Sequence, residues 1–242
     1  MKVLILAAGY ATRLYPLTLN KPKPLLEVGG MPIVEHILRI IEGSKELTGV
    51  LVVTNNKFHK NFNEWKDGVK FSHPIEVIND ETLSNDDRLG AIGDMNLALQ
   101  KANIDEDLMV IAGDNLFDFE LDGFVKFAKS HNGVTVGLRD VKERELAKKY
   151  GIVKLDDKSK VTLFVEKPAD PPSMLAAMCI YYFSKENLYL ISDYIATGKK
   201  QDAPGNLMAW LAGEGRLYGF KIDGRWFDIG DKASLERAEK EF

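Results

Sequence analysis

The segment KVLILAAGYATRL, residues 2–14, gives the strongest indication of how this chain folds. Its first part, Lys2 to Ala8, is a short continuous apolar run, which suits a strand buried on both faces of a parallel sheet. Gly9 follows the run, and small residues there let backbone N–H groups approach a phosphate closely. Because ligands bind beyond the carboxyl ends of the strands in an open α/β sheet, we expect an anion site at this loop.

Apolar segments of strand type and helix type alternate along the first half of the chain. A helix is expected over Pro32 to Ile41, where apolar residues recur at helical spacing behind a proline. The other expected strands are 49–54, 75–78, 108–112 and 134–138, and the other expected helices are 58–65, 91–100 and 121–131. This alternation predicts an α/β fold, a Rossmann-like three-layer sandwich with a mostly parallel central sheet.

The second half of the chain is richer in strands. Strands are expected at 151–155, 161–166, 176–183 and 217–222, and helices at 188–195, 206–212 and 233–242. No linker, repeat or low-complexity tract interrupts the chain. We therefore expect one domain, 1–242, in which the second half completes the other side of a cleft.

Composition narrows the class of protein. The 242 residues are 45% hydrophobic and 28% charged, and the net charge of -4 argues against general nucleic-acid binding. The single cysteine, Cys179, lies in an apolar run and allows no disulfide within the chain, so we expect an inert buried thiol. The first apolar run is too short for a signal peptide core or a membrane span. A reducing cytoplasm is the expected location.

Three cationic side chains follow the first strand: Arg13, Lys21 and Lys23. The planar guanidinium of Arg13 suits phosphate oxygens, and prolines beside the two lysines restrict their backbone. The loop has neither the Walker A pattern nor the dinucleotide pattern G-x-G-x-x-G. It is therefore a candidate phosphate site of another kind, or a basic loop on the surface.

Carboxylates end three other apolar segments, each open to two interpretations. Asp114 follows a buried strand and is a candidate Mg²⁺ ligand or a turn aspartate. Glu166 and Lys167 end another strand. They are interpreted either as ligand-binding groups or as a solvated surface pair. Asp228 lies between bulky apolar residues, where a metal or an ion pair with Arg225 or another basic residue would offset the cost of its burial.

Four motifs together resemble one family. They are LAAGYATRLYPLTLNKPKPLL at 6–26, GDN at 113–115, EKP at 166–168 and WFDIG at 226–230. Their order and spacing resemble the nucleotidyltransferases typified by glucose-1-phosphate thymidylyl- and uridylyltransferases. The resemblance implies the fold of nucleotide-diphospho-sugar transferases. It also implies transfer of a nucleotidyl group from UTP, dTTP or CTP to a sugar 1-phosphate, with Mg²⁺ as cofactor and neither nucleic acid nor membrane as partner.

The resemblance implies a catalytic role for five residues. Arg13 is expected at the outer phosphates of the triphosphate, and Lys23 near the α-phosphate. Asp114 and Asp228 are the expected ligands of Mg²⁺. Lys167 is expected to hold the phosphate of the acceptor.

The same resemblance divides the chain into a nucleotide-binding half, 1–140, and an acceptor-binding half, 141–242. The expected nucleotide contacts are Leu6, Ala7, Ala8, Gly9, Arg13, Lys23, Asn85, Gly90 and Asp114. The expected acceptor contacts are Tyr150, Gly151, Glu166 and Lys167. Asn85 is the candidate side chain for reading the base because its amide both donates and accepts, although a turn asparagine that caps the next helix fits equally.

The chain departs from the family pattern at three places. Ala11 replaces a glycine of the phosphate loop, the stretch 82–88 lacks the glutamine of thymidylyltransferases, and the acidic Asp94 has no assigned role. An alternative function is a cytidylyltransferase for phosphocholine or another non-sugar phosphate. A cationic headgroup would need aromatic or acidic contacts, which Trp210, Trp226 and Tyr150 could supply. A catalytically silent nucleotide-sensing subunit is a further alternative, which the full set of charged motif residues disfavours.

Overall fold

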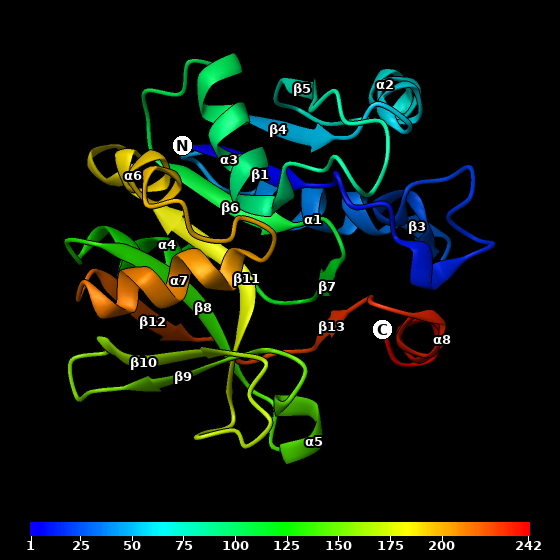
Figure 1. Ribbon diagram of the computed structural model, residues 1–242. Helices are drawn as coiled ribbons and strands as arrows, with labels where there is room; N and C mark the ends of the chain where they lie inside the picture. Colours follow the sequence, from blue (N-terminus) through cyan, green and yellow to red (C-terminus); the bar gives the residue numbers. More distant parts are fainter.

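Nine strands form the main sheet in the computed structural model, which describes residues 1–242 (Figure 1). These strands are β1 Lys2–Leu6, β4 Gly49–Thr54, β5 Ile75–Asn79, β6 Leu108–Ala112, β8 Val134–Asp140, β9 Gly151–Leu155, β10 Val161–Glu166, β11 Leu175–Phe183 and β12 Leu217–Lys221. The order is β10-β9-β11-β6-β1-β4-β5, and β8 pairs with both β11 and β12. Each of these strands was predicted to within two residues at either end.

The first half of the chain builds the parallel part of the sheet. Strand β1 runs parallel to both β4 and β6, and β5 extends the sheet beyond β4. The inner residues of β1, Val3 to Ile5, are fully buried because helices cover both faces, which explains the continuous apolar run. Strand β11 joins β6 in the antiparallel direction, so the second half of the chain adds most of the antiparallel pairs.

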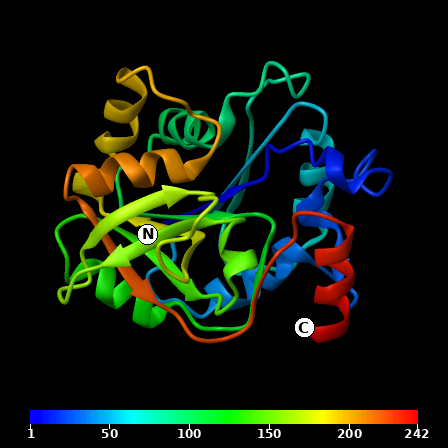
Figure 2. The same ribbon diagram turned by 60° about the horizontal axis from the view of Figure 1, so that its bottom comes forward.

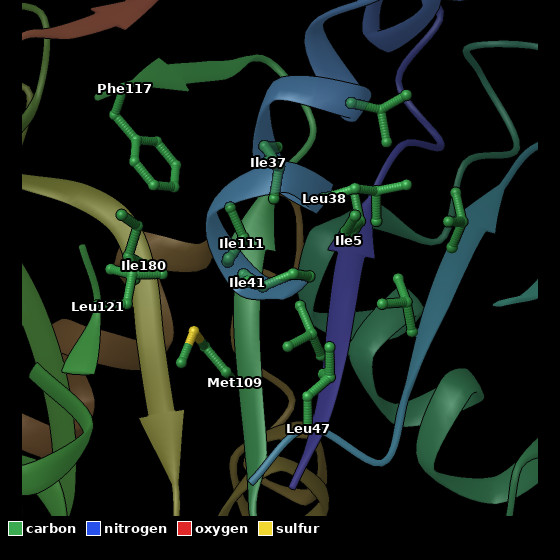
Figure 3. Close-up of a cluster of buried hydrophobic side chains, with 14 of the residues drawn as sticks. Ile5, Ile37, Leu38, Ile41, Leu47, Met109, Ile111, Phe117, Leu121 and Ile180 are labelled. Carbon is green, nitrogen blue, oxygen red and sulfur yellow. The ribbon is translucent and has the colours of Figure 1, made fainter. Parts of the chain in front are cut away.

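Helices cover the sheet on both sides, as the sequence predicted. One face carries α1 Ile33–Glu42, α2 His59–Gly68 and α4 Asp122–Lys129, and the other carries α3 Gly90–Lys101, α6 Tyr189–Ala196 and α7 Pro204–Gly213. Figure 3 shows the first face, where Ile37 and Ile41 of α1 lie over Ile5, Met109 and Ile111 of the sheet. No helix is both long and apolar enough to cross a membrane.

Two pairs of very short strands and two further helices lie at the margin of the sheet. Strand β7 (Asn115–Phe117) pairs with β13 (Trp226–Asp228), and β2 (Glu27–Val28) pairs with β3 (Met31–Pro32). Helices α5 (Arg144–Ala147) and α8 (Lys232–Glu241) complete the fold. Figures 1 and 2 both place α8 beside the N-terminal segment that carries β2 and β3. The C-terminal helix α8 thus lies against the N-terminal segment, and β13 lies beside β7, which follows β6 in the chain.

Strand β11 changes its neighbour partway along. Leu175 and Ala176 pair with β9, whereas Ile180 to Phe183 pair with β6, and the register shifts between the two parts. Cys179 lies in the shift with a left-handed φ of 52°. Cys179 was predicted to be buried, but it is only partly buried and lines the cleft. Desolvation still raises the pKa of its thiol, so the thiol stays protonated. This irregularity directs β9 and β10 away from β6, which separates the two halves of the sheet.

Candidate active site

A cleft of about 620 Å³ lies between the two halves of the sheet. The loops after β1 and β6 form one wall, and the ends of β9 and β10 with the start of α7 form the other. Every residue to which the resemblance gave a role in the site lines this cleft. Segments far apart in sequence are therefore brought together as the motifs predicted. Lys21, the third cation of the candidate phosphate site, does not line it and instead pairs with Glu27 at 3.0 Å.

The phosphate loop after β1 is fixed by hydrogen bonds to its backbone. Asn55 donates from Nδ2 to the carbonyl of Ala8 at 2.8 Å, and the hydroxyl of Thr18 donates to the carbonyl of Ala11 at 2.8 Å. Ala11 has φ 49° and ψ 40°, in the left-handed region that glycine adopts at little cost. The loop thus keeps the conformation that a glycine would favour, with an alanine in its place.

Asp114 is presented to the phosphate loop by a close backbone contact. Gly113 donates its N–H to the carbonyl of Leu6 at 2.9 Å, and a Cβ on Gly113 would lie only 2.9 Å from the same oxygen. Glycine is therefore required for β6 to end against β1. Lys23 Nζ lies 2.5 Å from Asp114 Oδ2, with both side chains mostly buried. Asp114 is thus part of a charged site and not only a turn residue.

Asp228 lies beside Asp114 because β13 pairs with β7. Asp228 is in register with Asn115, and Ile229 donates its N–H to the carbonyl of Asp114 at 3.1 Å. Burial and the negative charge of Asp114 raise the pKa of Asp228 to about 6, against the effect of Lys23 and Arg13. The alternative ion pair with Arg225 is wrong, because Arg225 binds Asp118 at 2.6 Å.

The adjacent carboxylates fit a magnesium site that a bound substrate would complete. Mg²⁺ is held in proteins by one or two carboxylates together with substrate phosphates and water. Asp114 and Asp228 supply that number of ligands at the wall where Arg13 and Lys23 also lie. No group of three or more His, Cys, Asp or Glu side chains in the chain could hold a metal by itself.

The opposite wall presents Glu166 and Lys167. A Cβ on Gly205, at the start of α7, would overlap the Glu166 carboxylate, so only glycine fits there. Lys167 has a left-handed φ of 47°, and its N–H donates to the carbonyl of Tyr150 at 3.0 Å. Burial raises the pKa of Glu166, whose side chain is 26% exposed, whereas Lys167 is 64% exposed. A fully solvated surface pair is therefore the wrong interpretation for Glu166.

Two of the three aromatic residues proposed for a cationic headgroup line the cleft, whereas Trp210 packs against Tyr194 with ring centroids 5.7 Å apart and does not line it. The rings of Tyr150 and Trp226 are 4.9 Å apart, and both residues line the cleft. Trp226 donates from Nε1 to Asn115 Oδ1 at 3.1 Å, and Asn115 donates to the carbonyl of Met178 at 2.6 Å. These contacts tie β13 to the irregular part of β11 and fix the position of the aromatic surface.

The far end of the cleft, where the resemblance places the base, is closed by Gly90. It has φ +79°, and a Cβ there would lie 2.7 Å from Asp202 Cα, so glycine is required on both counts. Arg88 binds Asp202 at 2.8 Å across the same contact. Asn85 lines this end, and its side chain does not cap α3, whose N-cap is Leu89 without a side-chain hydrogen bond. The helix-capping interpretation of Asn85 is therefore wrong.

Several lining residues were not predicted as site residues, among them Lys149, Asp80, Asp202 and Gly205. Lys149 directly precedes the Tyr150-Gly151 segment, which was a usable signal. Gly205 follows a proline at the start of a helix, an unusual place for a flexible residue, but the reason is its contact with Glu166. Asp80 and Asp202 lie in loops whose sequence gives no sign of their place in the cleft.

Comparison with known proteins agrees with this geometry. The sequence profile of the nucleotidyl transferase family matches residues 2–242, so the chain belongs to that family. It is 29% identical over 239 residues, 95% of the chain, to a UTP–glucose-1-phosphate uridylyltransferase of Synechocystis, and 32% identical over 236 residues, also 95% of the chain, to a mannose-1-phosphate guanylyltransferase catalytic subunit beta of Danio rerio. These matches cover 60% and 61% of the two relatives.

The fold is also found in a solved structure. A UDP-glucose pyrophosphorylase in complex with UDP-glucose superposes with a TM-score of 0.82 at 18% identity, covering 99% of this chain and 97% of that one. The predicted fold class, that of nucleotide-diphospho-sugar transferases, is therefore confirmed. The chain spans only about half to three-fifths of the length of the first relatives it matches.

Proposed function

We propose that the protein transfers a nucleotidyl group from a nucleoside triphosphate to a sugar 1-phosphate, forming an NDP-sugar and pyrophosphate. The observation that carries the proposal is the single cleft in which Arg13, Lys23, Asp114 and Asp228 line one wall and Glu166 with Lys167 lines the other. The named relatives support it, because they share a sugar 1-phosphate acceptor although they use different nucleotides.

The chemistry is in-line attack of an acceptor phosphate oxygen on the α-phosphorus, with pyrophosphate as leaving group. The attacking oxygen is already ionised, so no side chain has to supply a nucleophile or remove a proton. The main obstacle is repulsion between two anionic substrates, which Arg13, Lys23 and Lys167 would offset. Glu166, facing the acceptor end, would accept hydrogen bonds from sugar hydroxyls. Positioning across the two walls supplies much of the remaining acceleration.

We further propose Mg²⁺ as the cofactor, held by Asp114 and Asp228. When bound, the ion would neutralise charge on the transferring phosphates. Lys23, which binds Asp114, would orient that carboxylate and face the α-phosphate. Two repelling carboxylates in a mostly buried site support this assignment, because a divalent cation would remove the repulsion that raises the pKa of Asp228.

A pyrophosphate-release assay tests the proposal directly. We expect product with at least one pairing of ATP, CTP, GTP, UTP or dTTP with a panel of sugar 1-phosphates, and loss of product on removal of Mg²⁺. The panel includes phosphocholine, because the ring pair of Tyr150 and Trp226 could contact a cationic headgroup. Product with phosphocholine alone would favour the cytidylyltransferase alternative. Nucleotide binding without any product would favour a sensing subunit.

We propose the cytoplasm as the location of the enzyme. Fractionation of cells that express the full chain would test the location.

A further inference from the structure

Two buried carboxyl groups lie at the base end of the cleft, outside the charged motifs described above. Asp80 follows β5, and Asp94 lies in α3 near Gly90. Asp80 is 7% exposed and Asp94 is 6% exposed, yet both line the cleft. Carboxyl groups are rarely buried to this extent unless they are paired or bind something.

Asp80 is held as a hydrogen-bond acceptor. Its Oδ1 accepts from both the N–H and the hydroxyl of Thr82, each at 2.8 Å. Because the Thr82 hydroxyl is engaged as a donor, the hydroxyl of Tyr10, 3.2 Å away, donates to it in turn. This chain of donors stabilises the ionised form of Asp80, although burial raises the pKa of its carboxyl.

Asp94 is held as the neutral partner of Asp80. Burial, followed by the charge of Asp80 and a hydrogen bond to it, raises the pKa of Asp94 to about 8. Oδ1 of Asp94 is completely buried and has no other hydrogen-bond partner, so it carries the proton that is shared with Asp80. Oδ2 makes no hydrogen bond either but is not completely buried, so it is the oxygen that a molecule in the cleft can reach.

No lysine or arginine forms an ion pair with Asp94. Arg88, the cation at this end of the cleft, is bound to Asp202 at 2.8 Å. The charge of Asp87 acts on Asp80, and the Asp87 carboxylate accepts from the N–H groups of Leu83 and Ser84. The site therefore offers an unused acceptor, and a ligand that enters the cleft would have to supply the donor.

We propose that Asp94, positioned by Asp80, is the residue that reads the nucleobase, and that it accepts a hydrogen bond from an exocyclic amino group. This inference rests on the proposed function, because it requires a nucleoside triphosphate in the cleft. Cytosine, guanine and adenine carry such an amino group, whereas uracil and thymine present carbonyl oxygens at the corresponding positions. The two carboxyl groups share one proton, which already forms the hydrogen bond between them. A carbonyl oxygen of the base would therefore find no donor there, and its binding would be disfavoured.

Pairs of nucleotides that differ at the amino group test the inference on the unmodified protein. We expect kcat/KM for CTP to exceed that for UTP, or that for GTP to exceed that for ITP, by at least about tenfold, the usual effect of an unmet buried hydrogen bond. Titration calorimetry with each triphosphate alone measures the same preference in binding. Equal use of both members in both pairs, or a preference for UTP or dTTP, would overturn the inference.

Two substitutions at position 94 separate the role of the acceptor from that of packing. Asp94→Asn keeps a carbonyl acceptor and a donor toward Asp80, so we expect it to retain the preference. Asp94→Leu has similar size and no acceptor, so we expect it to lower the preference about tenfold. A shift of the preference in Asn85→Ala with none in Asp94→Leu would contradict the assignment. If no triphosphate gave product, the proposed function would fail. The relative affinities for the triphosphates, measured by calorimetry, would still test the role of Asp94.

Discussion

Gly205 and Glu166 are packed so closely that a single methyl group on Gly205 would overlap the Glu166 carboxylate. Gly205 lies in the first turn of α7, and Glu166 ends β10, so the helix presses against the strand at the acceptor wall. Gly151, in register with Glu166 on β9, leaves room from the other side. The position of Glu166 in the cleft therefore depends on two residues without side chains.

Replacing Gly205 is expected to damage acceptor use selectively. In Gly205→Ala the carboxylate of Glu166 must move, and a displacement of about 1 Å can lower kcat/KM by about a hundredfold. We expect that loss for the sugar phosphate, with nucleotide binding by calorimetry little changed. Gly213→Ala is the matched control, because Gly213 ends the same helix with nothing within 4 Å of a new Cβ. Equal behaviour of the two variants would show that the contact is irrelevant to activity.

The adjacent carboxylates lead to a prediction about the metal. Asp114→Asn or Asp228→Asn is expected to lower kcat by at least about a hundredfold, because each removes a charge that would hold Mg²⁺. Asp157→Asn, at an exposed turn outside the cleft, is the matched control. Steady-state kinetics with circular dichroism as a check of folding measures the effect. Near-normal turnover in either cleft variant would exclude the proposed ligand set.

The two walls predict that binding of the two substrates can be separated. Arg13 lies on the wall of the phosphate loop, and Lys167 lies on the opposite wall at the end of β10. We expect Arg13→Ala to weaken triphosphate binding and Lys167→Ala to raise the KM for the acceptor, each by about tenfold or more. Calorimetry with nucleotide alone measures the first effect. The roles would be reversed if Lys167→Ala lost nucleotide binding and Arg13→Ala kept it.

Much of the fold could be predicted because the buried strands are continuous apolar runs. Lys2–Leu6 and Gly49–Thr54 have this pattern because both faces of the sheet are covered. β7 and β13, with three residues each, are too short to show a period, although their pairing is what brings Asp228 to Asp114. The motif residues themselves were found through the resemblance, because the family pattern fixes the order and spacing of the motifs along the whole chain.

The remaining site residues could not be found because their roles come from packing between distant segments. Nothing near Gly205 in the sequence indicates that Glu166 lies against it. Asp94 was visible as an unexplained charge, but its partner Asp80 follows a different strand. At Ala11 the sequence shows a departure from the family pattern, yet the backbone keeps the left-handed conformation that a glycine would adopt.

The buried pair of Asp80 and Asp94 predicts how stability depends on pH. The pKa of Asp94 is raised in the folded protein, to about 8 from an ordinary value of 3.8. A raised carboxyl pKa stabilises the folded state below the unfolded pKa, and this contribution is lost as pH rises toward 8. Over that window the wild-type protein should lose about 1.4 kcal/mol of unfolding free energy per pH unit through this group.

Asp94→Asn removes that titration while keeping the shape and the hydrogen bond toward Asp80. We therefore expect the variant to gain stability relative to wild type steadily from pH 5 to pH 8, with the difference constant above pH 9. Urea unfolding at unit intervals of pH measures the difference, with Asp157→Asn as a control whose curve should run parallel to that of wild type. If the Asp94→Asn curve also ran parallel, Asp94 would be ionised in the folded protein, and its free oxygen would have to be satisfied by a cation instead of a base.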